Sequence, residues 1–382
     1  MSKNALWSSA VAVVVIVLTA CSSAPPPSPA PPPQEPVVSE PASAELPAPP
    51  PPPQPLPPEE PAEAEPPSVV VAEAWETVRR PEEAVDSVAV WPGRGARPWL
   101  LATAEATDRL LVFDAGTGEP LRDFGGSGEA AGLFRRPHGI AVADDLAFVV
   151  ERDNARVQVL RLPGLSTLGF VAVGELAHPH GIALVGRGSG VYDLYVTDDF
   201  EPGAAPPDRR VHHYRVEMAA DGLTSELVAT FGDATGDGAL TQVGTIGADP
   251  AAGHLLVAEE DATRRGLRIY GFDGRFTGRV VGGFAHEPAG VALYPCADGS
   301  GYWVVTDRGE ERTTFRVLDR ETFDEVGRFA GAVTANTDGA WMWSGASAEF
   351  PAGAFYALHD GRSVSAFGWG EVVEGLGLRG CE

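Results

Sequence analysis

The sequence feature that most constrains the fold is a short motif that recurs along the chain. Each copy is a turn followed by glycine and a β-branched or small residue, where an apolar strand begins. Two copies read PHGI, at residues 137–140 and 179–182, which is a spacing of 42 residues. One longer interval follows, and the remaining copies recur after 43 and 49 residues. These copies, and an earlier unit that lacks the glycine, begin near Thr245, Glu287, Asn336 and Ser87.

Each unit continues with three more short strands. The second strand is apolar and ends in an acidic residue, and these acids are Glu151, Asp198, Glu259 and Asp307. Four short strands in every repeat of this length predict an all-β fold, a β-propeller with one blade per repeat. We expect six blades over residues 86–382, with five or seven as the alternatives, and no long amphipathic helix. Residues 245–275 would form the fourth blade.

The N-terminus has the pattern of an export signal. A mostly small and apolar run at residues 5–20 follows Lys3, and it ends in Leu-Thr-Ala before Cys21. That ending resembles a bacterial lipobox, so we expect residues 1–20 to be a lipoprotein signal peptide and Cys21 to be acylated. Ser22 favours sorting to the outer membrane, and hence a lipid-anchored protein of the cell envelope. The alternative is a secretory signal that is cleaved near Ala20.

The next segment, residues 21–85, has a composition that cannot form a packed core. Residues 24–68 hold 21 of the 35 prolines of the chain. Such a segment is expected to be a disordered, extended tether. A docking site for a partner is the alternative interpretation.

Charge and cysteine content limit the partners. The formal net charge is −25 and Lys3 is the only lysine, so nucleic acid is a poor partner. An anionic ligand would need clustered arginines or bound cations. In an exported protein, Cys296 and Cys381 are expected to form a disulfide, with two separate thiols as the alternative. We expect a monomer.

The C-terminal half, from residue 244, resembles the β-propeller phytases. The resemblance rests on LLVAEEDATRRGLRIYGFDG at 255–274, EPAGVALYPCADGSGYWVVTD at 287–307, TANTDG at 334–339 and FPAGAFYALHDG at 350–361. Their order and spacing match the last three blades of that family. Residues 86–243 match more loosely, and the units at 137–142 and 179–184 are equally similar to propellers of the NHL type.

This resemblance implies a 3-phytase-like activity, in which calcium ions held by carboxylates assist the attack of water on a small phosphate monoester. Glu260 matches a calcium ligand of the family, and Glu287 falls near a further acidic ligand. Arg152 falls near a phosphate-binding arginine. Together with Asp338, which precedes the glycine of the sixth unit, Glu260 and Glu287 are the expected catalytic residues.

The sequence also departs from the family pattern. Gly244 or Thr245, and Ala289, stand where the family has glutamates, and the paired lysines of its first blade have no counterpart at residues 104–107. These departures favour the alternative function, a non-catalytic propeller that binds a ligand or an envelope protein.

Further candidates come from local patterns. Asp233 and Asp237 lie in a D-x-T-x-D-G pattern that suits a calcium loop or an acidic turn. The cluster Glu259, Glu260 and Asp261 can supply calcium ligands, or can be an exposed strand end. Arg209 and Arg210 end a long loop that could act as a lid over an anionic ligand.

Two histidines occupy equivalent places in neighbouring repeats. His138 and His180 both precede the glycine of the motif. They can bind a transition metal, act as general acids, or serve only in packing. Propeller geometry predicts that the residues before this glycine face one another around the channel mouth, and the expected set is His138, His180, Thr245, Glu287 and Asp338.

Overall fold

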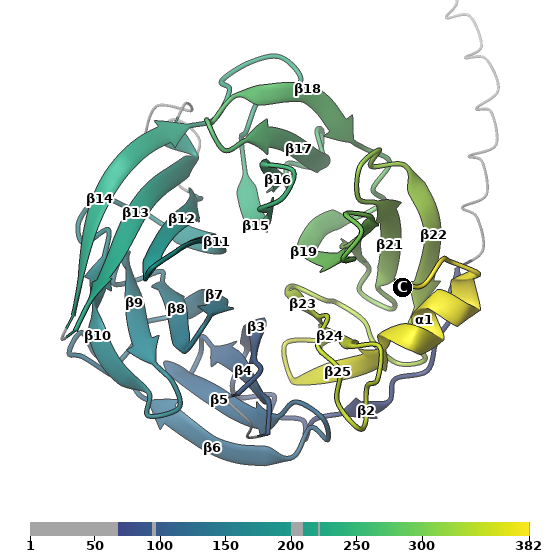
Figure 1. Cartoon of the computed structure of the whole chain (residues 1–382), viewed down its shortest axis with the longest axis horizontal. Helices are drawn as coiled ribbons and strands as arrows, with labels where there is room; N and C mark the ends of the chain where they lie inside the picture. Colours follow the sequence, from purple (N-terminus) through teal and green to yellow (C-terminus); the bar gives the residue numbers. More distant parts are fainter. Residues whose placement is uncertain (1–67, 94–96, 200–208, 221, 382) are drawn as a thin grey trace, which may run out of the picture. The chain divides into compact units, whose positions relative to one another are not determined.

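The computed structural model describes residues 68–93, 97–199, 209–220 and 222–381. The expected signal peptide, the lipidation site at Cys21 and most of the expected tether lie outside these residues. Within them the chain forms six β-sheets arranged radially around a common centre (Figure 1), where residues of the inner strands line a central channel. The predicted six-bladed propeller is thus confirmed.

The first three blades follow the chain order, from the innermost strand outward. Blade 1 contains β3 (Val85–Trp91), β4 (Trp99–Ala104), β5 (Arg109–Asp114) and β6 (Pro120–Gly125). Blade 2 contains β7 (Pro137–Ala143), β8 (Leu146–Glu151), β9 (Arg156–Arg161) and β10 (Ser166–Val171). Blade 3 contains β11 (Pro179–Gly188), β12 (Val191–Asp198), β13 (Val211–Ala219) and β14 (Gly222–Phe231).

Among the last three blades, blades 5 and 6 each include a strand from the N-terminal segment. Blade 4 contains β15 (Val243–Asp249), β16 (His254–Glu259), β17 (Gly266–Gly271) and β18 (Phe276–Val281). Blade 5 contains β19 (Glu287–Pro295), β20 (Gly301–Arg308), β21 (Thr314–Asp319), β22 (Glu325–Ala330) and the edge strand β1 (Val69–Val70). Blade 6 contains β23 (Ala340–Trp343), β24 (Ala354–His359), β25 (Ser363–Gly368) and the outermost strand β2 (Trp75–Glu76).

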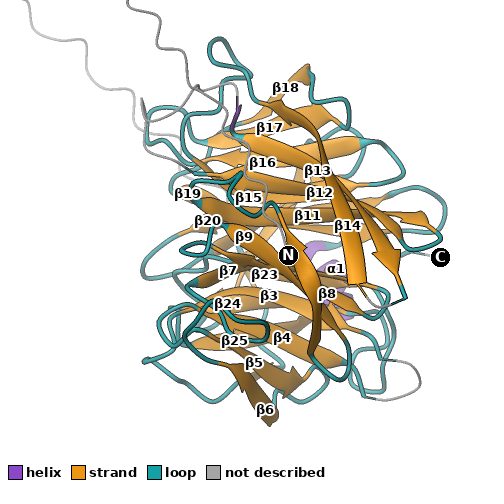
Figure 2. Cartoon of the chain, turned by 90° about the vertical axis from the view of Figure 1, so that its left-hand side faces the viewer, coloured by secondary structure: helices purple, strands orange, loops and turns teal. Residues whose placement is uncertain are grey.

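The hydrophobic core is divided into layers between adjacent blades. One layer joins Leu101 and Val112 of blade 1 to Val149 of blade 2, and another joins Leu256 of blade 4 to Val305 of blade 5. The second strands are buried on both faces, because each sheet packs against a neighbour on either side. This burial explains why these strands are continuous apolar runs rather than alternating ones. Figure 2 shows the stacked sheets from the side.

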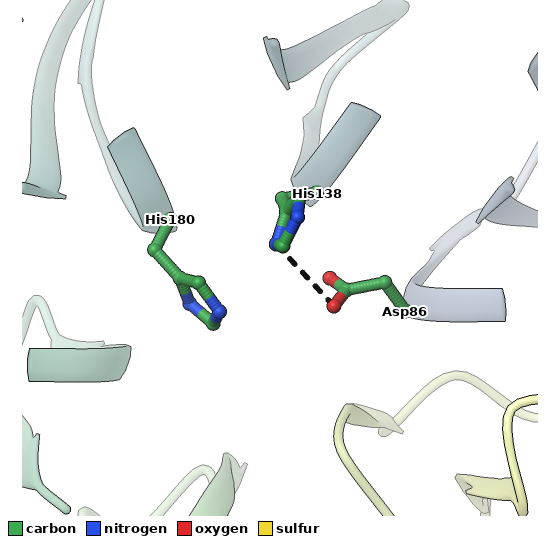
Figure 3. A group of neighbouring side chains, drawn as sticks. All are labelled: Asp86, His138 and His180. Atoms are coloured by element: carbon green, nitrogen blue, oxygen red, sulfur yellow. Dashed lines mark ion pairs between the residues drawn. The ribbon is translucent and has the colours of Figure 1, made fainter. Parts of the chain in front are cut away.

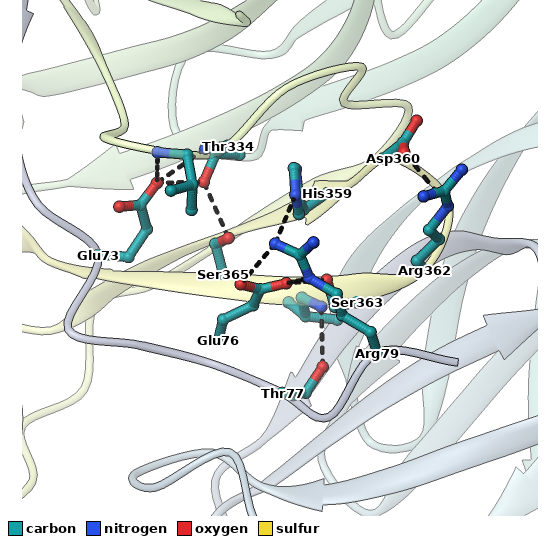
Figure 4. Close-up of polar contacts among 12 residues, drawn as sticks. Glu73, Glu76, Thr77, Arg79, Thr334, His359, Asp360, Arg362, Ser363 and Ser365 are labelled. Atoms are coloured by element: carbon teal, nitrogen blue, oxygen red, sulfur yellow. Dashed lines mark hydrogen bonds and ion pairs between the residues drawn. The ribbon is translucent and has the colours of Figure 1, made fainter. Parts of the chain in front are cut away.

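Both ends of the chain close the ring. Strand β2 pairs with β25, so blade 6 combines residues from the two ends (Figure 1). Polar contacts reinforce the pairing (Figure 4): Ser363 donates a hydrogen bond to Glu76 (2.6 Å), and the backbone N–H of Val364 donates to Thr77 (2.9 Å). Glu73 accepts a hydrogen bond from the Thr334 hydroxyl (2.6 Å), which ties the same segment to the loop before β23.

The folded domain therefore begins earlier than the expected boundary at residue 86. Strand β1 pairs in parallel with β22, and β2 follows it into blade 6. Two-residue strands leave no periodic pattern in the sequence, so the sequence alone predicts no strand in this segment.

The C-terminus is held by a helix and a disulfide. Helix α1 (Trp369–Leu376) buries Trp369 and Val372 against blades 5 and 6. Cys296, which follows β19, is joined to Cys381 by a disulfide, with 5.3 Å between their Cα atoms. None of the helices in the described residues is long and apolar enough to cross a membrane.

Candidate functional site

An irregularity repeated in the inner strands builds the channel mouth. In blade 2, Pro137 pairs with Glu151, but the next regular pair is Ile140 with Val149. The two residues between these pairs bulge out of the ladder, and the same shift occurs in β3, β11, β15 and β19. We call the first bulged residue of each blade, together with Asp338 before Gly339 in blade 6, the inner ring. Its members are Asp86, His138, His180, Gly244, Ala289 and Asp338.

A second set of polar residues follows the second strands. Each one comes directly after the residue that pairs with the residue before the bulge or, in blade 6, directly after the last residue of β24. We call this set the outer ring, and its members are Glu105, Arg152, Asp199, Glu260, Arg308 and Asp360. The outer ring combines two arginines with four acids, so it can contact both anions and cations.

The acids that end the second strands have a structural role. The Glu259 carboxylate is fully buried and accepts hydrogen bonds from the backbone N–H groups of Gln242 (3.0 Å) and Asp261 (3.1 Å). Asp198 accepts from Ala177 and His178 in the same way, and Asp307 accepts from Ala285 and His286. In each case the carboxylate fixes the loop that enters the inner strand. Glu259, expected as a metal ligand, is therefore committed to the backbone.

On one side of the mouth, three side chains converge from adjacent blades. Asp86, His138 and His180 extend from β3, β7 and β11 toward a common space (Figure 3). One ligand atom from each lies within 4.8 Å of the other two. The Nδ1 atom of His138 is 3.4 Å from the Asp86 carboxylate, and its Nε2 atom is 2.7 Å from the Glu105 carboxylate.

The charges of this cluster are set by its surroundings. Burial acts against protonation of His138, but Asp86 and Glu105 outweigh it and raise the pKa of His138. The hydrogen bond to His138 is the main reason that the pKa of Glu105 falls to about 2. Burial, with the nearby His138 and Arg152, lowers the pKa of His180 to about 4. His180 is therefore neutral at neutral pH.

On the other side of the mouth, the inner ring is small and the outer ring fills the space. A Cβ atom at Gly244 would overlap the Glu260 carboxylate, so glycine is required for Glu260 to lie there. Beside Ala289, Arg308 lies 2.5 Å from Asp338 and 3.3 Å from Glu287. A cavity of about 60 Å³ opens here, lined by Asp86, Ser87, His180, Gly181, Thr245, Glu260, Ala289, Arg308 and Asp338.

The acids around this cavity are crowded. Burial, followed by the charges of Glu287, Asp199 and Asp338, raises the pKa of Glu260 to about 8. Burial also raises the pKa of Asp338 to about 6, although Arg308 opposes the increase. Carboxyl groups in such a position are stabilised in their ionised form when a cation lies among them.

Several predicted site residues lie elsewhere. Asp261 is at the surface and accepts hydrogen bonds from Thr263. Asp233 and Asp237 lie in the loop between β14 and β15, where Asp237 lines a separate cavity with Arg264 and Arg268. The five expected metal ligands are therefore not brought together.

The three arginines that were expected to bind phosphate do not form one cluster. Arg152 belongs to the outer ring and lies 3.6 Å from Asp199. Arg209 is exposed, whereas Arg210 is buried and donates a hydrogen bond to the Asp198 carbonyl (3.4 Å). Residues 200–208 of the expected lid lie outside the described residues.

The predicted ring contained His138, His180 and Asp338 but missed three residues. Asp86 was missed because Ser87 replaces the glycine that marks the other repeats. Glu105 and Arg308 were missed as site residues, although each follows a second strand as Glu260 does. The common position of Glu260 and Arg308 in the repeat was the available signal. Thr245 is not a member of the inner ring, because it is the second bulged residue of blade 4, at the position that Gly139 holds in blade 2.

Comparisons with known proteins identify no family for this chain. No family model matches the chain, and no curated protein matches it. One similar solved structure is a chain of a nidogen/laminin complex, which is 16% identical over 66% of this chain and 82% of that chain, with a TM-score of 0.43. Another is the WD40 domain of Neurospora crassa Pan2, which is 6% identical over 72% of each chain, with a TM-score of 0.44. Neither likeness supports a statement about activity.

Proposed function

We propose that the channel mouth binds a small phosphate monoester and hydrolyses it with the help of calcium, as the resemblance to phytases implies. The observation that carries this proposal is the cavity in which Glu260 and Asp338 crowd together beside Arg308. A site that combines arginine with closely spaced carboxyl groups suits an anionic substrate accompanied by a cation.

The carboxyl groups on this side of the mouth fit calcium better than a softer metal. Glu260, Glu287 and Asp338 offer carboxylate oxygens, and with water they can supply the roughly six to eight oxygens that calcium takes. Their mutual repulsion, which contributes to the raised pKa of Glu260, would be offset by a cation. When bound, calcium would neutralise charge on the phosphate and assist the attack of water.

The arginines would position the substrate. Arg308 already contacts Glu287 and Asp338, so a phosphate oxygen beside these residues lies within reach of its guanidinium group. Arg152, on the opposite part of the outer ring, can contact another phosphate group of a multiply phosphorylated substrate such as phytate. Charge-assisted hydrogen bonds of this kind orient a phosphoryl group for attack.

The direct test is calcium-dependent phosphate release from phytate by the full chain. The Glu260→Gln variant should lose most of this release, because it removes a carboxylate that holds the cation. The Asp261→Asn variant should retain it, because Asp261 is at the surface and outside the cavity. Absence of release from the wild-type chain at several pH values, with or without calcium, would overturn the proposal.

One observation favours the alternative function, a non-catalytic propeller that binds a ligand or envelope protein. The inner ring has no carboxylate at Gly244 and Ala289, so the cation site has fewer ligands than the family pattern implies. Binding of phytate by the wild-type chain without phosphate release would support this second function.

We further propose that the protein is anchored to the cell envelope through acylated Cys21. Replacing Cys21 with serine should move the protein from the membrane fraction to the soluble fraction. Retention of the Cys21→Ser variant in the membrane fraction would contradict the anchor.

A further inference from the structure

We infer that the channel mouth holds a second, chemically different metal site, in which Asp86, His138 and His180 bind a divalent transition metal of the zinc class. This inference goes beyond the proposed hydrolysis and does not depend on it. The donors are two imidazoles and one carboxylate, contributed by three consecutive blades.

The donor types select the class of metal. Imidazole nitrogen suits zinc, cobalt, iron and nickel, whereas calcium and magnesium prefer oxygen. The site is therefore distinct in chemistry from the carboxylate group formed by Glu260, Glu287 and Asp338, although Asp86 and His180 line the same small cavity.

The distances are close to those that a metal requires. Two ligands of a tetrahedral zinc ion lie about 3.3 Å apart, given metal–ligand bonds of about 2.0 Å. His138 Nδ1 and the Asp86 oxygen are already 3.4 Å apart. The largest separation within the cluster is 4.8 Å, so one ligand has to move by roughly 1.5 Å to complete the site. His180 is partly exposed and lines the small cavity, which leaves space beside its ring for such a movement.

The surroundings of His138 also resemble those of a metal ligand. Its ring is buried, and its two nitrogens face the carboxylates of Asp86 and Glu105. Its Nε2 atom lies 2.7 Å from Glu105, on the side opposite the Asp86 carboxylate. Histidines that bind metals usually direct their second nitrogen at a carboxylate, which fixes the orientation of the ring. Glu105 is therefore a positioning residue, and Nδ1 is the atom left for the metal.

The nitrogens of His180 are available to a metal. Neither accepts or donates a hydrogen bond among the described residues, and the ring lies beside that of His138, with 4.8 Å between the centroids. Three protein ligands leave a coordination position open, and the adjacent cavity gives that position access to a small molecule. The occupant is therefore expected to be a metal that can also contact a ligand in the channel.

The test is a titration of the metal-free full chain with Co²⁺, followed by visible absorption, in buffer that contains excess calcium. We expect one equivalent of Co²⁺ to bind with ligand-field absorption bands, and Zn²⁺ to displace it. The His180→Ala variant should bind Co²⁺ about 100-fold more weakly and lose the bands. Because His180 is partly exposed, this variant should fold, and an unchanged circular dichroism spectrum will check this.

The matched control is His286→Ala. His286 also precedes an inner strand and lies near an aspartate, but it is exposed and outside the cluster. This variant should bind Co²⁺ as the wild-type chain does. The inference is overturned if the wild-type chain binds Co²⁺ no more tightly than about 1 mM, or if His180→Ala binds it with unchanged affinity.

This result is separable from that of the proposed hydrolysis. Metal binding is measured without substrate, and phosphate release is measured with calcium alone. Co²⁺ binding without phosphate release would support the metal site and reject the hydrolysis, and the reverse result would do the opposite.

Discussion

The two sides of the channel mouth fill the same position of the repeat in opposite ways. In blades 1 to 3 the inner ring carries long polar side chains, which are Asp86, His138 and His180. In blades 4 and 5 it carries Gly244 and Ala289, and Glu260 and Arg308 of the outer ring occupy the space instead. One repeat therefore yields a nitrogen-rich side and an oxygen-rich side within a single channel.

This difference teaches that a substitution in the inner ring acts on two residues. In blade 4, the glycine at position 244 admits the Glu260 carboxylate, which a Cβ atom there would overlap. A glycine at position 244 thus does not leave this part of the mouth without a carboxyl group, because that of Glu260 takes the volume. Ring residues should be compared in pairs, one from each ring.

The largest effect is expected from Arg308→Ala, which removes the cation of the oxygen-rich side. Phosphate release should fall by about 10- to 100-fold, since a charge-assisted hydrogen bond contributes about 1.5–3 kcal/mol. Steady-state release from phytate in calcium measures this. Arg275→Ala, at a side chain that is 87% exposed, should have no effect. Equal activity of the two variants would show that Arg308 does not contact the substrate.

The corresponding change on the nitrogen-rich side is Glu105→Gln. It keeps the shape of the side chain but weakens the interaction that orients His138. Co²⁺ affinity should fall by roughly 10- to 100-fold, while calcium-dependent phosphate release should be retained. Parallel titrations with Co²⁺ and calcium provide the measurement. A loss of calcium affinity equal to that of Co²⁺ would mean that the two sides are not chemically separate.

Gly244→Ala tests whether the two rings exchange volume. The new methyl group would displace the Glu260 carboxylate, so we expect a loss of about 1–3 kcal/mol in the free energy of unfolding and weaker calcium binding. The control is Gly282→Ala, because an added Cβ there has no neighbour within 4 Å. Denaturant unfolding of both variants gives the comparison. If Gly244→Ala is as stable as Gly282→Ala, the Glu260 carboxylate does not depend on the space left by Gly244.

A smaller effect concerns how the blades are joined away from the mouth. Asp249, at the end of β15, forms a buried ion pair with Arg320 of blade 5 (2.6 Å), whereas Asp144, after β7, accepts a hydrogen bond from the uncharged Tyr192 hydroxyl of blade 3 (2.6 Å). Burial alone would raise the pKa of Asp249, but Arg320 and backbone N–H groups hold that pKa below its usual value.

The sign of the pH dependence follows from this lowered pKa. The pair stabilises the fold fully above the unfolded pKa of about 3.8, and its contribution is lost as the pH falls through the lower folded value. Acid pH should therefore lower the melting temperature of the wild-type chain more than that of the Asp249→Asn variant. Thermal unfolding of both proteins at acid and at neutral pH measures this. Parallel acid profiles for the two proteins would contradict this.

Much of the fold could be predicted because each blade is a local unit. The glycine motif, the apolar second strand and the turn residues recur with a regular spacing, so six sheets follow from the pattern alone. Strands β1 and β2 could not be predicted in this way. They are two residues long, and they are stabilised by partners about 260 to 290 residues away in the sequence.

The site could be predicted only in part, for a geometric reason. Alternation along a strand indicates that Glu259 and Glu260 face opposite directions, but not which of them faces the channel. Glu260 faces the channel because β15 is bulged and because the Glu259 carboxylate accepts a hydrogen bond from the backbone N–H of Gln242. The pairing of outer-ring residues with small inner-ring residues depends on side-chain volume across two strands, which no linear motif records.

The pairing of β2 with β25 also affects the order of assembly during synthesis. Ribosomes deliver the N-terminal strand first, yet its partner is Ser363–Gly368, near the end of the chain. Blades 1 to 4 can therefore form progressively, while β1 and β2 wait for their partners in blades 5 and 6. The circle becomes complete in one late event, after which Cys381 can reach Cys296. The disulfide thus stabilises a ring that can close only after the strands of blade 6 have been synthesised.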